Sequence, residues 1–177
     1  MQTDPGTPGP KDITAESLFG PLPTSMEQFN QLLQAATSAS ESGKTLGDVK
    51  QIAPQDLNTL YDQALALCEK EEWSEAALIA VQLSMHDIRN PRFLFLTGTC
   101  LQRLQQMQMA AGVFGLALME REEPITLFRL AECLAASGEF GPARQAFDAC
   151  YDMCRGDFVH RELQDACADA LGKLKPH

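Results

Sequence analysis

The chain has 177 residues, 45% of them hydrophobic, and a formal net charge of −10. This length suits one domain with an appendage. Such a negative charge repels phosphate backbones and anionic membrane surfaces, which argues against binding to nucleic acid or to a membrane. No apolar run approaches the roughly 18 residues of a membrane span, and the N-terminus lacks the basic start and apolar core of a secretory signal. The six cysteines lie in alanine-rich, helical-looking segments. These totals predict a soluble intracellular protein in a reducing compartment.

Residues 1–25 hold five of the ten prolines. A segment of this composition buries too little apolar surface to offset the entropy of ordering, so we expect a disordered proline-rich leader. Residues 26–45 then predict a tethered amphipathic helix and a linker, because Met26, Phe29 and Leu33 share one helical face. Two partners for this apolar face stay open: the helix's own domain, or a second subunit.

From Pro54 onward the sequence predicts nearly continuous helix, since Pro suits the first helical turn and strand-like alternation is absent. Residues 60–83, 94–117 and 127–150 repeat one pattern. Each has a small residue in a first helix (A), a polar turn, and a bulky residue followed three positions later by alanine in a second helix (B). The small residues are Ala64, Gly98 and Ala131; the bulky ones are Trp73, Met107 and Phe140; the alanines are Ala76, Ala110 and Ala143.

The alanine intervals, 110 − 76 = 34 and 143 − 110 = 33, match the period of tetratricopeptide repeats. The pattern predicts an all-α fold in which residues 46–157 form three helix–turn–helix repeats, at about 57–90, 91–123 and 124–157, stacked as a short right-handed superhelix. Residues 158–177 predict a C-terminal capping helix, whose apolar stripe consists of Val159, Leu163, Cys167, Ala170 and Leu174.

The sequence gives little sign of catalytic or metal chemistry. Cys150 and Cys154 have a spacing that suits a metal, but His160 does not complete a ligand set, so core packing is the favoured interpretation. The histidines lack a nucleophile partner, and no glycine-rich phosphate loop occurs. We therefore expect neither enzymatic activity nor a cofactor.

The A helices are expected to line a concave groove that binds a peptide. Tyr61, Phe95 and Phe128 occupy equivalent positions on them, and three aligned rings favour a binding surface over a purely structural role. The candidate groove residues are Asn58, Tyr61, Leu65, Cys68, Trp73, Phe95, Thr99, Gln102, Phe128 and Glu132. The alternative, that the rings belong to the core, stays open.

Three segments carry a resemblance to a known family. "TLGDVKQIAPQDLNTLYDQAL", "NPRFLFLTGTCLQRLQQMQMAA" and "FRLAECLAASGEFGPARQAF" are similar to successive segments of the class II chaperones of bacterial type III secretion. The resemblance runs from about Gly43 to Lys175.

The resemblance implies a small cytoplasmic bacterial chaperone that binds hydrophobic translocator proteins before export and keeps them soluble and secretion-competent. It also implies that a proline-containing N-terminal segment of the translocator lies in the groove, and that the N-terminal helix contributes a homodimer contact through Met26, Phe29 and Leu33. This sequence departs from the family at Leu65 and Cys68, where aromatic residues are common.

Two other kinds of binding module are alternatives to this chaperone. A co-chaperone for the acidic tails of heat-shock proteins needs lysine and asparagine in the groove to bind a carboxylate. Here Tyr61 and Leu65 stand at such positions, which argues against this function. An adaptor for another component of the secretion apparatus, such as a needle subunit, stays open.

Overall fold

The structure, a computed structural model, describes residues 13–21 and 26–174, and all regular structure within these ranges is helical. Three short or peripheral helices come first, followed by three helical hairpins and a C-terminal pair. Their bounds are α1 (Ala15–Phe19), α2 (Met26–Glu41), α3 (Leu46–Val49), α4 (Pro54–Glu69), α5 (Trp73–His86), α6 (Pro91–Arg103), α7 (Met107–Glu120), α8 (Pro124–Ala136), α9 (Phe140–Met153), η1 (Phe158–His160) and α10 (Arg161–Lys173).

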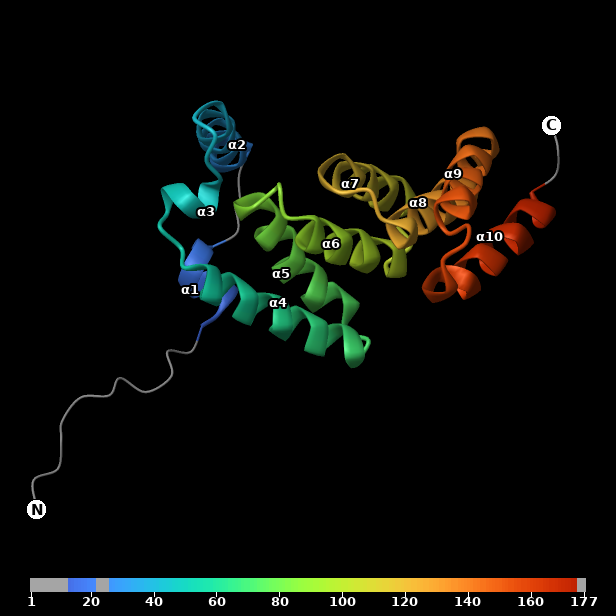
Figure 1. Cartoon of the computed structure of the whole chain (residues 1–177). Helices are drawn as coiled ribbons and strands as arrows, with labels where there is room; N and C mark the ends of the chain where they lie inside the picture. Colours follow the sequence, from blue (N-terminus) through green and yellow to red (C-terminus); the bar gives the residue numbers. More distant parts are fainter. Residues whose placement is uncertain (1–12, 22–25, 175–177) are drawn as a thin grey trace, which may run out of the picture.

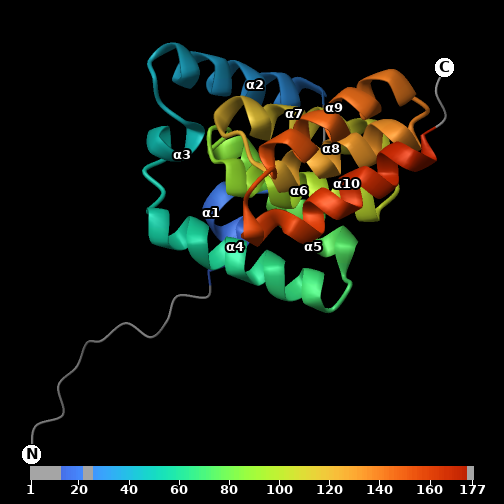
Figure 2. The same cartoon turned by 45° about the vertical axis from the view of Figure 1, so that its right-hand side comes forward.

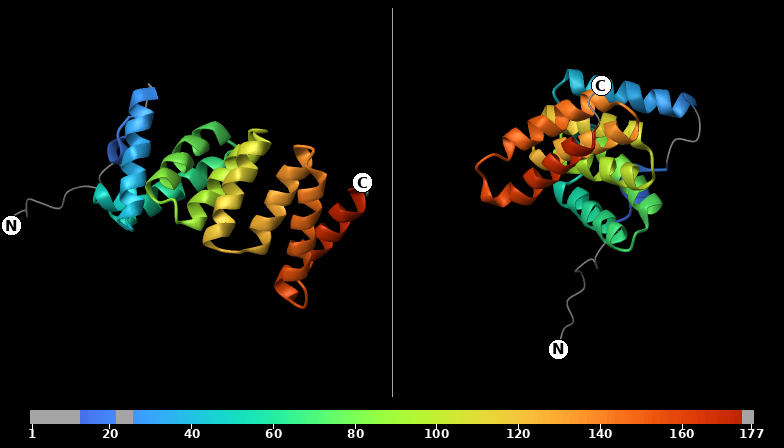
Figure 3. Two further views of the ribbon diagram at one scale, coloured as in Figure 1. Left: turned by 90° about the horizontal axis from the view of Figure 1, so that it is seen from above. Right: turned by 90° about the vertical axis from the view of Figure 1, so that its right-hand side faces the viewer.

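The hairpins α4–α5, α6–α7 and α8–α9 pack in chain order, each second helix against the first helix of the next hairpin. Figures 1 and 3 show the result as an array, with α2 and α3 at one end and α10 at the other. This arrangement confirms the all-α fold with three tetratricopeptide-type repeats and a C-terminal cap.

The same local signals start and turn each repeat. Pro54, Pro91 and Pro124 are the first residues of α4, α6 and α8, where a missing N–H costs nothing. In the turns that follow, Glu71, Gln105 and Gly138 have left-handed φ angles of 61°, 61° and 83°. Their spacing of 34 and 33 residues repeats that of the buried alanines, so the period is present in the backbone as well as in the sequence.

Small residues let the two helices of each hairpin approach. Ala64, Ala131 and all three B-helix alanines are fully buried, and Gly98 is also buried. A Cβ atom added to Gly98 would lie 2.7 Å from the ring of Phe114, so this position has no room for a side chain. The bulky residues of the repeat pattern do not share this burial. Trp73, Met107 and Phe140 begin their B helices, but none is buried and Phe140 is 42% exposed, because they lie at the open turn end of each hairpin.

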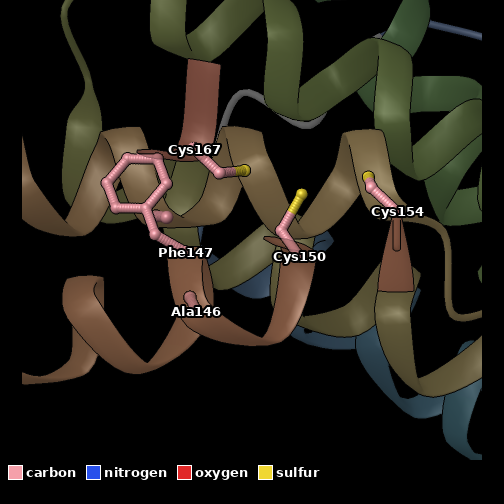
Figure 4. Close-up of a cluster of buried hydrophobic side chains, with 6 residues drawn as sticks. Ala146, Phe147, Cys150, Cys154 and Cys167 are labelled. Carbon is pink, nitrogen blue, oxygen red and sulfur yellow. The ribbon is translucent and has the colours of Figure 1, made fainter. Parts of the chain in front are cut away.

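The C-terminal cap is shorter than predicted. The chain forms the 3-10 turn η1 before α10 begins, and Val159, predicted to lie on the apolar stripe, is 86% exposed there. The other predicted stripe residues do pack against the last repeat, with Cys167 fully buried. Figure 4 shows Cys167 beside Phe147, Cys150 and Cys154, where α10 closes the core that α8 and α9 leave open.

Part of the predicted disordered leader is folded. Residues 13–21 contain α1, which begins with a capping box between Thr14 and Ser17. Phe19 is buried and stacks on the ring of His86 with the ring centroids 4.0 Å apart. The proline content of the leader outweighed the short apolar run "ITAESLF", whose apolar side chains pack on the core of the first repeat. Figures 1 and 2 show α1 beside α4 at this end of the molecule. Residues 1–12 and 22–25 lie outside the described residues.

The predicted N-terminal amphipathic helix is present as α2, whose main packing partner is α3. Ala39, near its C-terminus, is buried. The side chains of Met26, Phe29 and Leu33 lie outside the described part of the structure, so their predicted dimer contact stays a prediction. Across the described ranges, every helix falls short of the length and apolar character that a membrane crossing requires.

Candidate functional site

The predicted groove residues lie mainly on the A helices α4, α6 and α8, and we call the surface that they share the A-helix face. Its members on these helices are Tyr61, Leu65, Cys68, Phe95, Thr99, Gln102, Phe128 and Glu132. Contacts between side chains of successive A helices join the face, although the helices themselves are separated in sequence by about one repeat.

Each aligned ring rests on a phenylalanine behind it. Tyr61 lies 5.7 Å from Phe93, Phe95 lies 5.7 Å from Phe114, and Phe128 lies 5.5 Å from Phe147, measured between ring centroids. The backing rings are buried, whereas the three aligned rings are half-buried. The rings therefore belong both to the core and to the surface, because one side of each ring packs on the core and the other side reaches the surface.

The first two A helices meet at a pair of thiols. Leu65 is 37% exposed. Cys68, one turn further along α4, is half-buried with its sulfur 3.8 Å from that of Cys100 on α6. Burial, with the neighbouring Cys68, raises the pKa of Cys100 to about 12, and burial also raises the pKa of Cys68. Both thiols are consequently protonated at neutral pH and act as apolar contacts.

Glu132 is already engaged by the protein. Its Oε2 accepts a hydrogen bond from Arg129 Nη1 at 2.9 Å and another from Gln102 Nε2 at 3.1 Å. Arg129 lies three residues earlier on α8, whereas Gln102 comes from α6, so Glu132 ties two repeats together across the A-helix face. A polar tie of this kind fixes the distance between α6 and α8 where the aromatic positions lie.

Two arginines were missed by the sequence reasoning. The guanidinium carbon of Arg92 lies 4.4 Å from the centroid of the Tyr61 ring, and that of Arg103 lies 5.1 Å from the centroid of Trp73, both within the range of cation–π attraction. Both arginines are exposed. Their spacing of 11 residues, three helical turns, is the signal that would have placed them on one stripe of α6.

The remaining predicted residues lie at the margins. Trp73 is half-buried beneath Arg103 at the start of α5 and so borders the A-helix face. Asn58 is exposed and lines a pocket of about 350 Å³. Other residues of this pocket come from α3 and from the α5–α6 connection, including Asp48 and Arg89.

The cysteines of the last repeat have a structural role. Cys150 donates a hydrogen bond to the carbonyl oxygen of Pro124 at 3.1 Å, and burial raises its pKa. Burial likewise raises the pKa of Cys133 to about 11. Among the residues that the structure describes, no cluster of three or more His, Cys, Asp or Glu is arranged to hold a metal ion.

The fold and this face define a class: an all-α protein of three tetratricopeptide-type repeats whose A helices present half-buried rings, two exposed guanidiniums and a polar tie. Within that class, the comparisons bear out the resemblance read from the sequence, because the chain is similar to class II chaperones of type III secretion. No protein-family model matches it.

Three relatives illustrate the similarity. Low calcium response locus protein H of Yersinia pestis is 25% identical over 142 residues, which is 80% of this chain and 84% of the relative. A type III secretion system complex from Aeromonas hydrophila superimposes with a TM-score of 0.74 at 25% identity, over 80% of this chain and 95% of that one. The Yersinia enterocolitica chaperone SycD, solved with a peptide of the translocator YopD, gives a TM-score of 0.67 at 22% identity, over 70% and 95% of the two chains.

Proposed function

We propose that this chain is a cytoplasmic chaperone of a bacterial type III secretion system, which binds hydrophobic translocator proteins and keeps them soluble and secretion-competent. The observation that carries the proposal is the row of half-buried rings on the A-helix face, one per repeat and each backed by a buried phenylalanine. Rigid rings of this kind anchor peptides at a low cost in conformational entropy. The SycD structure with a YopD peptide supports the assignment of cargo class.

The bound segment is proposed to lie along the A-helix face, in contact with the exposed side of the rings and with Leu65, Cys68 and Thr99. This role requires neither a cofactor nor catalysis. We further propose that the protein is a homodimer and that α2 supplies the contact through Met26, Phe29 and Leu33.

The sharpest test replaces an exposed apolar residue rather than a ring. Tyr61 and Phe95 also pack on the core, so removing them would lower stability together with binding. Leu65 is 37% exposed, and Leu65→Asp places a charge on the binding face at little cost to the fold. Co-expression of this variant with a hydrophobic translocator should leave the translocator insoluble, because a buried unpaired carboxylate disfavours apolar contact.

The matched control is Leu78→Asp, which adds the same charge at an exposed leucine of the B helix α5. It should retain the soluble complex, and circular dichroism should show equal helix content in both variants. If Leu65→Asp still holds the translocator in solution, the A-helix face is not its binding site. If the unmodified chain also fails to solubilise any translocator but captures a needle subunit, the adaptor function replaces the chaperone function.

A further inference from the structure

We infer that Arg92 and Arg103 are specificity-determining residues of the A-helix face, and that each receives a separate carboxylate of the bound peptide. The inference rests on the proposed function and adds to it the charge of the cargo segment: two acidic side chains beside the apolar anchors.

The first observation is the charge of α6 itself. The chain carries a net charge of −10, yet α6, "PRFLFLTGTCLQR", contains two arginines and no acidic residue. This helix is the central A helix of the three, so the positive charge lies in the middle of the A-helix face.

The second observation is that these guanidiniums have no carboxylate partner among the residues that the structure describes. Arg121, Arg129 and Arg155 each form an ion pair at 2.8 to 3.0 Å. Within the described residues, Arg92 and Arg103 form none, although Asp62 and Glu69 lie on the neighbouring helix α4. The contacts that position them are the rings of Tyr61 and Trp73. Contact of a guanidinium with a ring leaves those of its N–H groups that point away from the ring free to donate.

The third observation is their geometry. Eleven residues correspond to about 1,100° of helical rotation, which brings Arg103 within about 20° of Arg92 around the helix axis. The stripe between them contains Thr99, a predicted groove residue. Along the axis the two positions are about 16 Å apart. Each guanidinium is held at a different ring, Arg92 at Tyr61 and Arg103 at Trp73, so one carboxylate does not reach both. Two acidic residues are therefore required.

Physical chemistry favours this pairing once a peptide is bound. An arginine held over a ring has already lost part of its side-chain freedom, so it loses less entropy when it binds a carboxylate. The apolar contacts of the same peptide exclude water from the pair, which strengthens the attraction relative to an exposed ion pair.

The experiment uses the translocator segment that co-purifies with the intact chain, trimmed by limited proteolysis and labelled with a fluorophore. Dissociation constants are measured by anisotropy for the unmodified chain, Arg92→Gln and Arg103→Gln, against the segment and against versions in which each Asp or Glu becomes Asn or Gln. Each arginine variant should weaken binding by about five- to tenfold, and the loss should shrink as salt rises.

Double-mutant cycles should then couple Arg92 to one acidic residue of the segment and Arg103 to a different one. Arg155→Gln is the matched control, because Arg155 also lies over a ring, Tyr151, but is already paired with Asp152 at 2.8 Å. It should bind the segment as tightly as the unmodified chain.

The outcomes separate this inference from the function beneath it. If the unmodified chain binds the segment and both arginine variants bind it equally well, the carboxylate inference is overturned while the chaperone function stands. Loss of affinity without coupling to any acidic residue also overturns it, since the arginines would then act only by supporting Tyr61 and Trp73. If no segment is captured at all, both proposals fall.

Discussion

Gly98 faces Phe114 across the contact between α6 and α7. A Cβ atom there would meet three carbons of the Phe114 ring at 2.7 to 2.9 Å, and that ring is fully buried. Gly112, inside α7, has nothing within 4 Å of the same added atom and is exposed. Two helical glycines thus differ in the space available beside them, which makes them a direct test of the packing.

Gly98→Ala should lower the free energy of unfolding by about 1–3 kcal/mol, because the ring has nowhere to move in a packed core. Gly112→Ala should raise it by about 0.5–1 kcal/mol, because alanine loses less backbone entropy in a helix. Urea denaturation followed by circular dichroism measures both. Equal effects of the two substitutions would contradict the close approach of α6 and α7.

At the scale of single elements, α1 covers the end of the first repeat. Its backbone is held by two side chains of the main body: Lys50 Nζ donates to the carbonyl oxygen of Phe19 at 3.0 Å, and Gln63 Nε2 donates to that of Ile13 at 2.9 Å. Below Phe19 lies His86, whose Nδ1 donates to the carbonyl oxygen of Gln82 at 2.8 Å. Its Nε2 is buried and has no hydrogen-bond partner within residues 13–21 and 26–174. The neutral ring is therefore the form that suits the folded state.

This burial makes the docking of α1 depend on pH. Burial lowers the pKa of His86 below 6.5, and the charge of Lys50 lowers it further, against the raising effect of the bond to Gln82. As pH falls through 6.5, His86 takes up a proton in the unfolded chain before it does in the folded chain. The stabilisation from the neutral, buried ring is therefore complete above pH 6.5 and is lost as pH falls toward the lowered pKa of the folded state. Phe19→Ala should admit water and move the pKa of His86 back up toward 6.5.

Titration of the histidine ring protons by NMR measures this shift. Phe158→Ala is the control, because Phe158 lies in η1, is 90% exposed, and makes no such contact with His86. A pKa of His86 that is unchanged by Phe19→Ala would mean that α1 does not cover the ring in solution.

The elements also show where sequence reasoning reaches its limit. The repeat was predictable because close packing demands small residues at a fixed period, and Ala76, Ala110 and Ala143 satisfy it. The ion pair of Arg129 with Glu132 also follows from local sequence, since residues three apart lie side by side on a helix. The bond from Gln102 to Glu132 joins residues 30 apart and depends on the tilt between repeats, which no local pattern specifies. For α1, a compositional signal of disorder outweighed a short apolar run that is stabilised only by tertiary contacts.

At the scale of the whole molecule, the distribution of charge bears on the choice of bound segment more than the net charge does. A net charge of −10 keeps the chain soluble and repels other acidic chains in general. The two arginines of α6, in contrast, favour acidic side chains at the central part of the A-helix face. A chaperone with this distribution would discriminate among apolar segments by their flanking acids, because apolar contact alone distinguishes such segments weakly.

The proposed dimer depends on α2, which stands at the end of the array and packs on α3 (Figure 3). Because its sequence places Met26, Phe29 and Leu33 on one face, Phe29→Glu combined with Leu33→Glu should separate the proposed dimer by adding two charges to an apolar contact. Light scattering should fall from the mass of two chains to that of one, 19.4 kDa, with helix content unchanged. The control, Gln31→Glu with Gln34→Glu, adds the same charge at two exposed positions of α2 and should remain dimeric. A mass of 19.4 kDa for the unmodified chain, or an equal loss in the control, would show that this face does not join two chains.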